Sequence, residues 1–266
     1  MKKTHGIRGS SKHILDWLSK DKAQFFKLLN KLLVPSGAII SEADALMPVG
    51  RGNAEDTKEA RLDQDSLNTL SSGQQKELAD WWLEHKKIGR ANTPNWDLAV
   101  GCSISGRRGL VLVEAKAHPK ELSYKGKALE PGCSSESKEN DIKIGRAILE
   151  ANIALKKKFP GIRISKDTHY QLSNRIAFSW KLASMGIPVV LVYLGFLKDD
   201  GLKDIDTPFA SDEYWRLFMR SYIKNVVPAD FMERPIDCGR ATMHVMVRSL
   251  PIIEVSPSRK DVLKML

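Results

Sequence analysis

The chain has 266 residues, of which 42% are hydrophobic and 28% charged, and this composition excludes a fibrous or wholly disordered protein. It contains no run of about 18 apolar residues that would span a membrane, no signal peptide, and three cysteines too far apart for a metal site, so we expect a cytoplasmic protein without a membrane partner. The formal net charge of +10, with basic residues concentrated in 1–31 and 116–166, indicates a polyanionic partner such as nucleic acid.

The first 71 residues are predicted to form a helical N-terminal extension. Apolar residues spaced by three, four and seven predict an amphipathic helix over 13–33, which Pro35 ends. Asn53 is placed to cap a short polar helix that runs to about Leu70. A helix over 73–88, with an apolar face that includes Leu78 and Trp82, opens the main domain, which we expect to comprise residues 72–266.

The pattern changes to strands after Pro94. Residues 97–104 alternate between apolar and small or polar side chains, and residues 110–118 form a second apolar strand after a turn, so the two predict a hairpin. A loop over 119–136, helices over 138–158 and 168–184, a continuous apolar strand over 187–196, a helix over 211–224 and a strand over 242–248 follow. This order predicts an α/β fold with a mixed central sheet flanked by helices.

The segment with most chemical information is the end of the second hairpin strand. Glu114 and Lys116 are two residues apart, so their side chains lie on the same face of a strand that is otherwise apolar. Charged groups at such a position are unfavourable unless they are paired, hydrated or bound to a metal. Asp97 begins the partner strand, and the Ala115 carbonyl lies between the two charged side chains. These oxygen donors predict a site for Mg²⁺ or Mn²⁺, with Lys116 beside it to hold a water or stabilise a phosphate.

Pro94, Asp97, a hairpin, and then Glu114-Ala115-Lys116 resemble the PD-(D/E)XK nuclease superfamily, which has the restriction-endonuclease-like fold. The resemblance covers about residues 72–197, with Asn95 and Trp96 separating the proline from the aspartate. It implies a Mg²⁺-dependent deoxyribonuclease, of the endonuclease type, that hydrolyses phosphodiester bonds in DNA. Asp97 and Glu114 would be metal ligands and Lys116 the catalytic lysine.

The resemblance also implies further site residues. Many members carry an acidic residue on the helix before the first strand, for which Glu77 and Glu84 are the candidates here and Glu59 a more distant one. Some members carry a glutamine on the following core helix, and Gln171 matches that role. His118 shares the strand face of Glu114 and is a candidate for contacting a phosphate or a water. The expected contacts with the DNA backbone are Lys86, Lys87, Arg90, Arg107, Arg108 and Arg175.

Two questions stay open at this stage. A turn centred between Ser105 and Gly106 sets Asp97 opposite Glu114, whereas a turn on Arg107 and Arg108 separates the two carboxylates by about 13 Å. The function also has alternatives, namely a non-catalytic nucleic-acid-binding or assembly protein on the same fold, or an unrelated enzyme acting on a small anion. A homodimer is possible because cutting both strands of a duplex often needs two active sites. The preference for DNA over RNA and the target are not encoded in these motifs.

Overall fold

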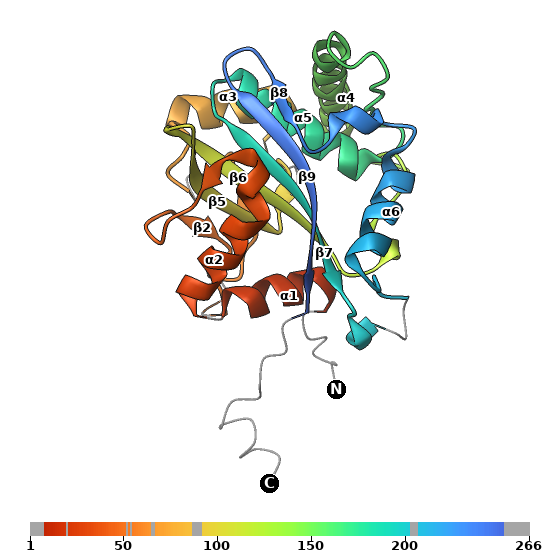
Figure 1. Ribbon diagram of the computed structural model, residues 1–266. Coiled ribbons are helices and arrows are strands. Elements are labelled where there is room, and N and C mark those ends of the chain that lie inside the picture. Colours follow the sequence, from red (N-terminus) through yellow and green to blue (C-terminus); the bar gives the residue numbers. More distant parts are fainter. Residues whose placement is uncertain are drawn as a thin grey trace.

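A central mixed sheet organises the protein, which is described by a computed structural model over residues 8–19, 21–51, 53, 55–64, 67–86, 92–202 and 207–252. Seven strands of the described residues form this sheet in the order β1-β5-β6-β7-β9-β8, with β2 also pairing with β5 (Figure 1). Their bounds are β1 Ala38–Ile39, β2 Leu46–Met47, β5 Leu98–Ile104, β6 Arg107–Lys116, β7 Val189–Leu197, β8 Pro235–Asp237 and β9 Thr242–Pro251.

The β5–β6 hairpin has the register that opposes the two carboxylates. Ile104 pairs with Arg107, so Ser105 and Gly106 alone form the turn. Both turn residues have positive φ angles, 51° for Ser105 and 75° for Gly106. A two-residue turn with two positive φ angles matches the twist of the flanking strands, and glycine adopts this conformation without steric cost. Of the two turns that the sequence left open, the structure therefore has the one between Ser105 and Gly106.

Parallel pairing begins after β6. Strands β6, β7 and β9 run parallel to one another, whereas β8 is antiparallel to β9. Helices α4 (Ser135–Lys156) and α5 (Tyr170–Ser184) connect β6 to β7, and α6 (Asp212–Ile223) precedes β8 and β9. Residues from Val189 to Phe196 of β7 are buried, which confirms that the apolar run over 187–196 is a strand covered on both faces.

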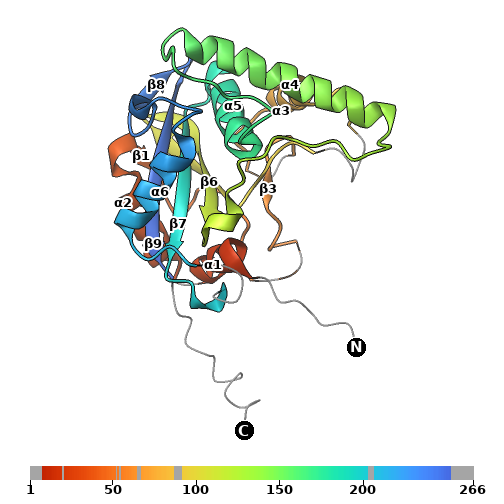
Figure 2. The same ribbon diagram turned by 90° about the vertical axis from the view of Figure 1, so that its right-hand side faces the viewer.

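Helices cover both faces of the sheet (Figures 1 and 2). Helices α1 (Gly9–Leu18) and α2 (Lys22–Leu33) pack on one face, where alternate strand residues such as Val111 and Val113 meet them. Helix α3 (Ser72–Trp82) and helices α4, α5 and α6 pack on the other face against Leu110 and Leu112. The expected α/β class, with a mixed central sheet flanked by helices, is thus confirmed.

The N-terminal region differs from the prediction in two respects. The helix expected over 13–33 is two helices, because the Asp21 carboxylate accepts a hydrogen bond from Ala23 N and starts α2 as a new helix. The helix expected from Asn53 to about Leu70 is wrong. The Asn53 side chain caps a turn by accepting from Glu55 N and Asp56 N, and the chain then forms β3 (Ala60–Arg61), which pairs with β4 (Asn95–Trp96).

The remaining features are the end of helix α3 and short turns of 3₁₀-helix. Helix α3 ends at Trp82, earlier than expected, because Glu84 N and His85 N donate to the Asn140 side chain on α4 rather than continuing the helix. Single turns of 3₁₀-helix are η1 (Val34–Ser36), η2 (Pro119–Glu121), η3 (Asp200–Leu202) and η4 (Ala229–Phe231). Among the described residues, no helix combines the length and the apolar character that crossing a membrane requires.

Candidate active site

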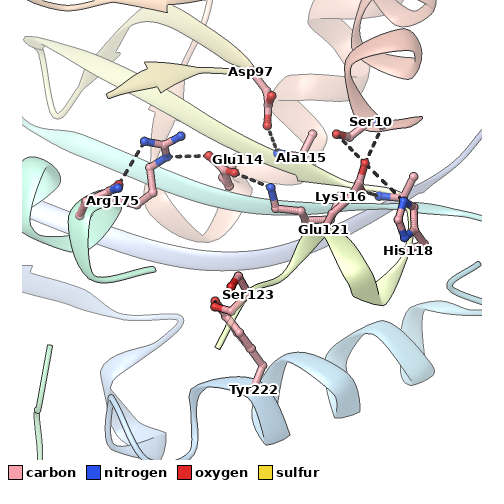
Figure 3. Close-up of polar contacts among 12 residues, drawn as sticks. Ser10, Asp97, Glu114, Ala115, Lys116, His118, Glu121, Ser123, Arg175 and Tyr222 are labelled. Atoms are coloured by element: carbon pink, nitrogen blue, oxygen red, sulfur yellow. Dashed lines mark hydrogen bonds and ion pairs between the residues drawn. The ribbon is translucent and has the colours of Figure 1, made fainter. Parts of the chain in front are cut away.

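Asp97 and Glu114 face each other at the end of the β5–β6 hairpin. Leu98 pairs with Val113, and the same register continued by one residue sets Asp97 opposite Glu114. Asp97 leaves the regular strand at this point, and its Oδ2 accepts a hydrogen bond of 2.7 Å from Ala115 N (Figure 3). The hairpin therefore brings together the two carboxylates and the intervening backbone of Ala115, as in one of the two registers that the sequence left open.

Glu114 is held by two cations. Lys116 Nζ donates to Glu114 Oε1 at 2.5 Å, and Arg175 Nε on α5 donates to Oε2 at 2.5 Å (Figure 3). The exposed fractions of Glu114, Lys116 and Arg175 are 2%, 5% and 8%. The Arg175 guanidinium also stacks over the Trp96 ring at 4.7 Å. Burying a carboxylate at such a depth requires this pairing, because an isolated buried charge is strongly unfavourable.

The charges of the cluster shift its pKa values in a consistent way. Burial, and then the neighbouring charge of Glu114, raises the pKa of Asp97 from 3.8 to about 7. Burial alone would raise the pKa of Glu114, but Arg175 and Lys116 hold it below its usual value. Burial alone would lower the pKa of Lys116, but the charges of Glu114 and Asp97 raise it. Near neutral pH, Glu114 is therefore ionised and Lys116 protonated, while Asp97 is close to its own pKa.

Glu59 brings a third carboxylate towards Asp97. In the β3–β4 pair Ala60 lies opposite Trp96, so Glu59 lies opposite Asp97 one step further along. The negative charge of Glu59 contributes to the raised pKa of Asp97. Both side chains line a cleft of about 850 Å³ whose walls also include Lys58 and Arg61. Asp97 thus connects the buried cluster to an open cleft.

The structure corrects the predicted third acid. Glu77 forms an ion pair with Lys181 on α5 at 2.8 Å, and Glu84 forms one with Lys143 on α4 at 3.0 Å. The face of α3 that carries Glu77, and the residues just after that helix, turn towards lysines of the neighbouring helices rather than towards the hairpin. Glu59 is the glutamate that the fold sets opposite Asp97, although the sequence made it the most distant candidate.

His118 and Gln171 belong to the elements that carry the cluster, namely the end of the β6 segment and helix α5. His118 is buried, and its Nε2 lies 3.8 Å from Glu121 Oε1. Gln171 is half-buried on α5, one helical turn before Arg175 and on the same face. Sequence reasoning missed Glu121, which accepts hydrogen bonds from Ala117 N and from both the backbone and the hydroxyl of Ser10. The sequence feature that could have indicated Glu121 is its position in the turn directly after the strand of Glu114 and Lys116.

Among the described residues, the arginines and lysines expected to contact DNA have internal partners. Lys86 pairs with Asp80 and Arg108 with Asp44, while Arg107 donates to the carbonyls of Gly186 and Arg240. Arg107 also lies at the far end of β6, nine residues from Lys116 and hence about 30 Å along the strand. Arg175 is buried against Glu114, so it positions that carboxylate instead of meeting a phosphate. Lys87 and Arg90 lie outside the described residues.

The site offers few side-chain ligands for a metal. Within the described part of the chain, no three His, Cys, Asp or Glu side chains are grouped closely enough to hold an ion. Asp97 and Glu114 are opposite each other in the hairpin, and the sequence assigned the carbonyl of Ala115 to the site as a third oxygen.

Comparisons of the chain with protein-family models, with curated proteins and with solved structures gave no significant match.

Proposed function

We propose that this protein is a metal-dependent nuclease that hydrolyses phosphodiester bonds in DNA, with Asp97 and Glu114 as ligands of Mg²⁺ or Mn²⁺ and Lys116 as the residue that assists the attacking water. One observation carries the proposal: the hairpin register sets Asp97 opposite Glu114, with Lys116 on the same strand face as Glu114. The strand–strand–helix–strand order over β5, β6, α4, α5 and β7 also resembles the PD-(D/E)XK pattern.

The chemistry of the donor groups fits a hard divalent cation. Mg²⁺ and Mn²⁺ prefer carboxylate and carbonyl oxygens, which Asp97, Glu114 and Ala115 supply. The raised pKa of Asp97 shows that its negative charge is not fully compensated by Lys116, because burial and the charge of Glu114 both oppose ionisation. A divalent cation at this position would reverse that balance and favour the ionised carboxylate.

In the proposed reaction, a change of partner by Lys116 makes one oxygen of Glu114 available as a metal ligand. Lys116 holds Glu114 Oε1 and Arg175 holds Oε2. If Lys116 turns towards a phosphate or water, Oε1 becomes available while Arg175 keeps the carboxylate in place. Lysine is protonated at neutral pH, so the ammonium of Lys116, turned in this way, orients the attacking water and stabilises charge on the phosphoryl oxygens. The bound metal would lower the pKa of the attacking water and stabilise the same charge.

The proposal is tested by cleavage of plasmid and oligonucleotide DNA in the presence of Mg²⁺ or Mn²⁺. We expect Asp97→Asn, Glu114→Gln and Lys116→Met each to lower the rate by roughly 100-fold or more, because each removes a metal ligand or the group beside the water. Glu77→Gln is the matched control, since Glu77 pairs with Lys181 away from the cluster. Cleavage that persists in all three site variants would refute the assignment.

A second candidate, a non-catalytic nucleic-acid-binding or assembly protein, is favoured by one feature. The side chains that form the ion pairs of Glu114 with Lys116 and Arg175 are almost fully buried, as in a purely structural network. The same experiment separates the two functions. DNA binding that weakens steeply with salt, in a wild-type protein that cuts no substrate, would support this candidate and contradict the nuclease.

A further inference from the structure

Tyr124 is a half-exposed aromatic residue in the loop that follows the Glu114–Lys116 strand. Its side chain is 53% exposed, among the largest values for an aromatic residue in the described part of the chain. The loop follows η2, and Tyr124 lies only eight residues after Lys116 in the chain. An exposed tyrosine at such a place is either incidental or a contact surface, and the way it is supported distinguishes these possibilities.

Two other rings support Tyr124. Its ring centroid lies 5.1 Å from that of His169 and 5.1 Å from that of Tyr222, and these two rings are 5.0 Å apart. Edge-to-face and tilted arrangements at these separations are favourable. His169 adopts a left-handed backbone conformation with a φ of 47°, which is unfavourable for a residue with a side chain. The surrounding contacts hold His169 there, against the two tyrosines.

The backbone of the loop is fixed at three successive carbonyls. Tyr222 donates its hydroxyl hydrogen to Ser123 O at 2.9 Å, and His169 N donates to Tyr124 O at 3.0 Å. Tyr170 N donates to Lys125 O at 3.0 Å. A surface held in this way loses little conformational entropy when a ligand binds.

Gly126 completes the anchorage of the loop. A Cβ atom at this position would lie 2.4 Å from the backbone oxygen of Asp167, so only glycine allows the two segments to approach so closely. Directly after it, Lys127 N donates to Lys166 O at 2.7 Å. Tyr124 is therefore presented by a rigid loop rather than by a mobile one.

The charge around Tyr124 suits a polyanion. Lys125 is exposed next to it, Lys120 lies four residues before it, and both belong to the basic region over 116–166. An aromatic side chain between lysines is the combination by which proteins bind single-stranded nucleic acid, since bases stack on the ring and cations follow the backbone. The loop lies within electrostatic range of the candidate active site: burial, and then the charges of Tyr124 and Glu114, raise the pKa of Tyr222, whose hydroxyl donates to Ser123 O of this loop (Figure 3).

We infer that Tyr124, supported by His169 and Tyr222, is a stacking site for an unpaired nucleobase, so that the nucleic acid bound at the Asp97–Glu114–Lys116 site is single-stranded near the bond to be cut. The inference rests on the proposed function and specifies its substrate class. In a duplex the faces of internal bases are already stacked on one another, so a fixed ring at the surface can receive only a base that is unpaired or at an end.

Binding to oligonucleotides tests this site independently of cleavage. The affinities of a single strand and of a covalently closed circular duplex, which has no ends, are measured in the Lys116→Met background, in which the nuclease proposal expects cleavage to be slower by roughly 100-fold or more. We expect Tyr124→Ala to weaken single-strand binding between roughly 5-fold and 100-fold, the range for loss of one base–aromatic stack, and to change duplex binding less than about twofold. Tyr124→Phe keeps the ring and is expected to bind like the parent protein.

Tyr214→Ala is the matched control, because Tyr214 is 41% exposed on α6. Thermal unfolding of each variant checks that the fold is kept. Replacing one nucleotide of the strand at a time by an abasic one gives a second measure: at the stacked position the effect of Tyr124→Ala disappears. Equal effects of Tyr124→Ala and Tyr214→Ala, or equal weakening of single strand and duplex by Tyr124→Ala, would overturn the inference.

The outcomes for the inference and for the proposed function are separate. Tyr124-dependent binding of single strands by a wild-type protein that cuts none of them would support the stacking site and refute the nuclease. Metal-dependent cleavage that is unchanged by Tyr124→Ala on every substrate, single strands included, would support the nuclease and refute the stacking site.

Discussion

Arg175→Met is the substitution whose effect on stability follows most directly from the structure. The Arg175 guanidinium is buried, donates to Glu114 Oε2 at 2.5 Å and to Asn174 Oδ1 at 3.1 Å, and stacks over Trp96. Methionine fills much of the same volume without a charge. The variant therefore leaves the Glu114 carboxylate buried with Lys116 as its remaining cation, and leaves Trp96 without its stacked partner.

The expected loss of unfolding free energy is about 4 kcal/mol. Removing one partner of a buried ion pair costs about 3–5 kcal/mol, and the lower end applies because Lys116 still holds the other oxygen of Glu114. Loss of the cation–π contact with Trp96 adds about 1 kcal/mol. An exposed pair of the same type provides the comparison. Arg216 contacts Asp212 at 2.7 Å with both side chains over 40% exposed, so Arg216→Met should cost less than about 1 kcal/mol.

Urea unfolding at pH 7 measures both variants. The double variant with Arg175→Met and Glu114→Gln gives a further test, because a neutral amide no longer needs a cation and part of the lost stability should return. The reasoning is wrong if Arg175→Met loses no more stability than Arg216→Met. It is also wrong if the double variant is no more stable than Arg175→Met alone, since Glu114 would then not be the group that Arg175 stabilises.

Three further predictions concern Asp97 and the neighbouring Glu59. Its pKa is raised from 3.8 to about 7, so the ionised form is disfavoured in the folded state, and the stability of the metal-free protein should fall as pH rises through this interval. Urea unfolding of Asp97→Asn should lack this fall, so its stability relative to wild type should increase between pH 4 and pH 8; a constant difference would contradict the raised pKa. Secondly, Mn²⁺ should raise the melting temperature of the wild type at pH 7.5, because a ligand that binds only the folded state stabilises it, whereas Asp97→Asn should not respond. Glu59→Gln should raise roughly 10-fold the Mn²⁺ concentration needed for half of this rise in melting temperature, because Glu59 lies opposite Asp97. Glu77→Gln should leave that concentration unchanged, because Glu77 pairs with Lys181. The opposite result would indicate that Glu77, and not Glu59, is the acidic residue next to the site.

The sequence predicts most of the elements that carry the site because their signals are local. Alternation over 97–104 and the apolar run over 187–196 follow the two-residue repeat and the uniform burial of strands, and β5 and β7 correspond to them within two residues. The turn at Ser105 and Gly106 was one of two possibilities, and the positive φ of both residues decides between them. Once that register is fixed, Asp97 must face Glu114.

The errors arise where distant parts of the chain meet. Glu59 was predicted in a helix, but Ala60 and Leu62 are both buried, and pairing of β3 with β4 makes the segment extended. That pairing spans more than thirty residues and has no local signal. Arg175 was expected to meet a phosphate, because its position on α5 is visible in the sequence but its proximity to Glu114 is not. Helix α3 likewise ends where Asn140 captures two of its following amides.

The net charge of +10 locates an interface only after the internal partners of each cation are known. Lys86, Arg107 and Arg108 are tied to an aspartate or to carbonyls, and Arg175 is buried, so their charges stabilise the fold instead of forming a rim around the site. An arginine bound to Glu114 still serves the proposed reaction, because it keeps that carboxylate ionised and fixed while Lys116 changes partner. In the proposed function, exposed cations such as Lys125 beside Tyr124, on the loop that leads out of the strand of Lys116, would meet the polyanion.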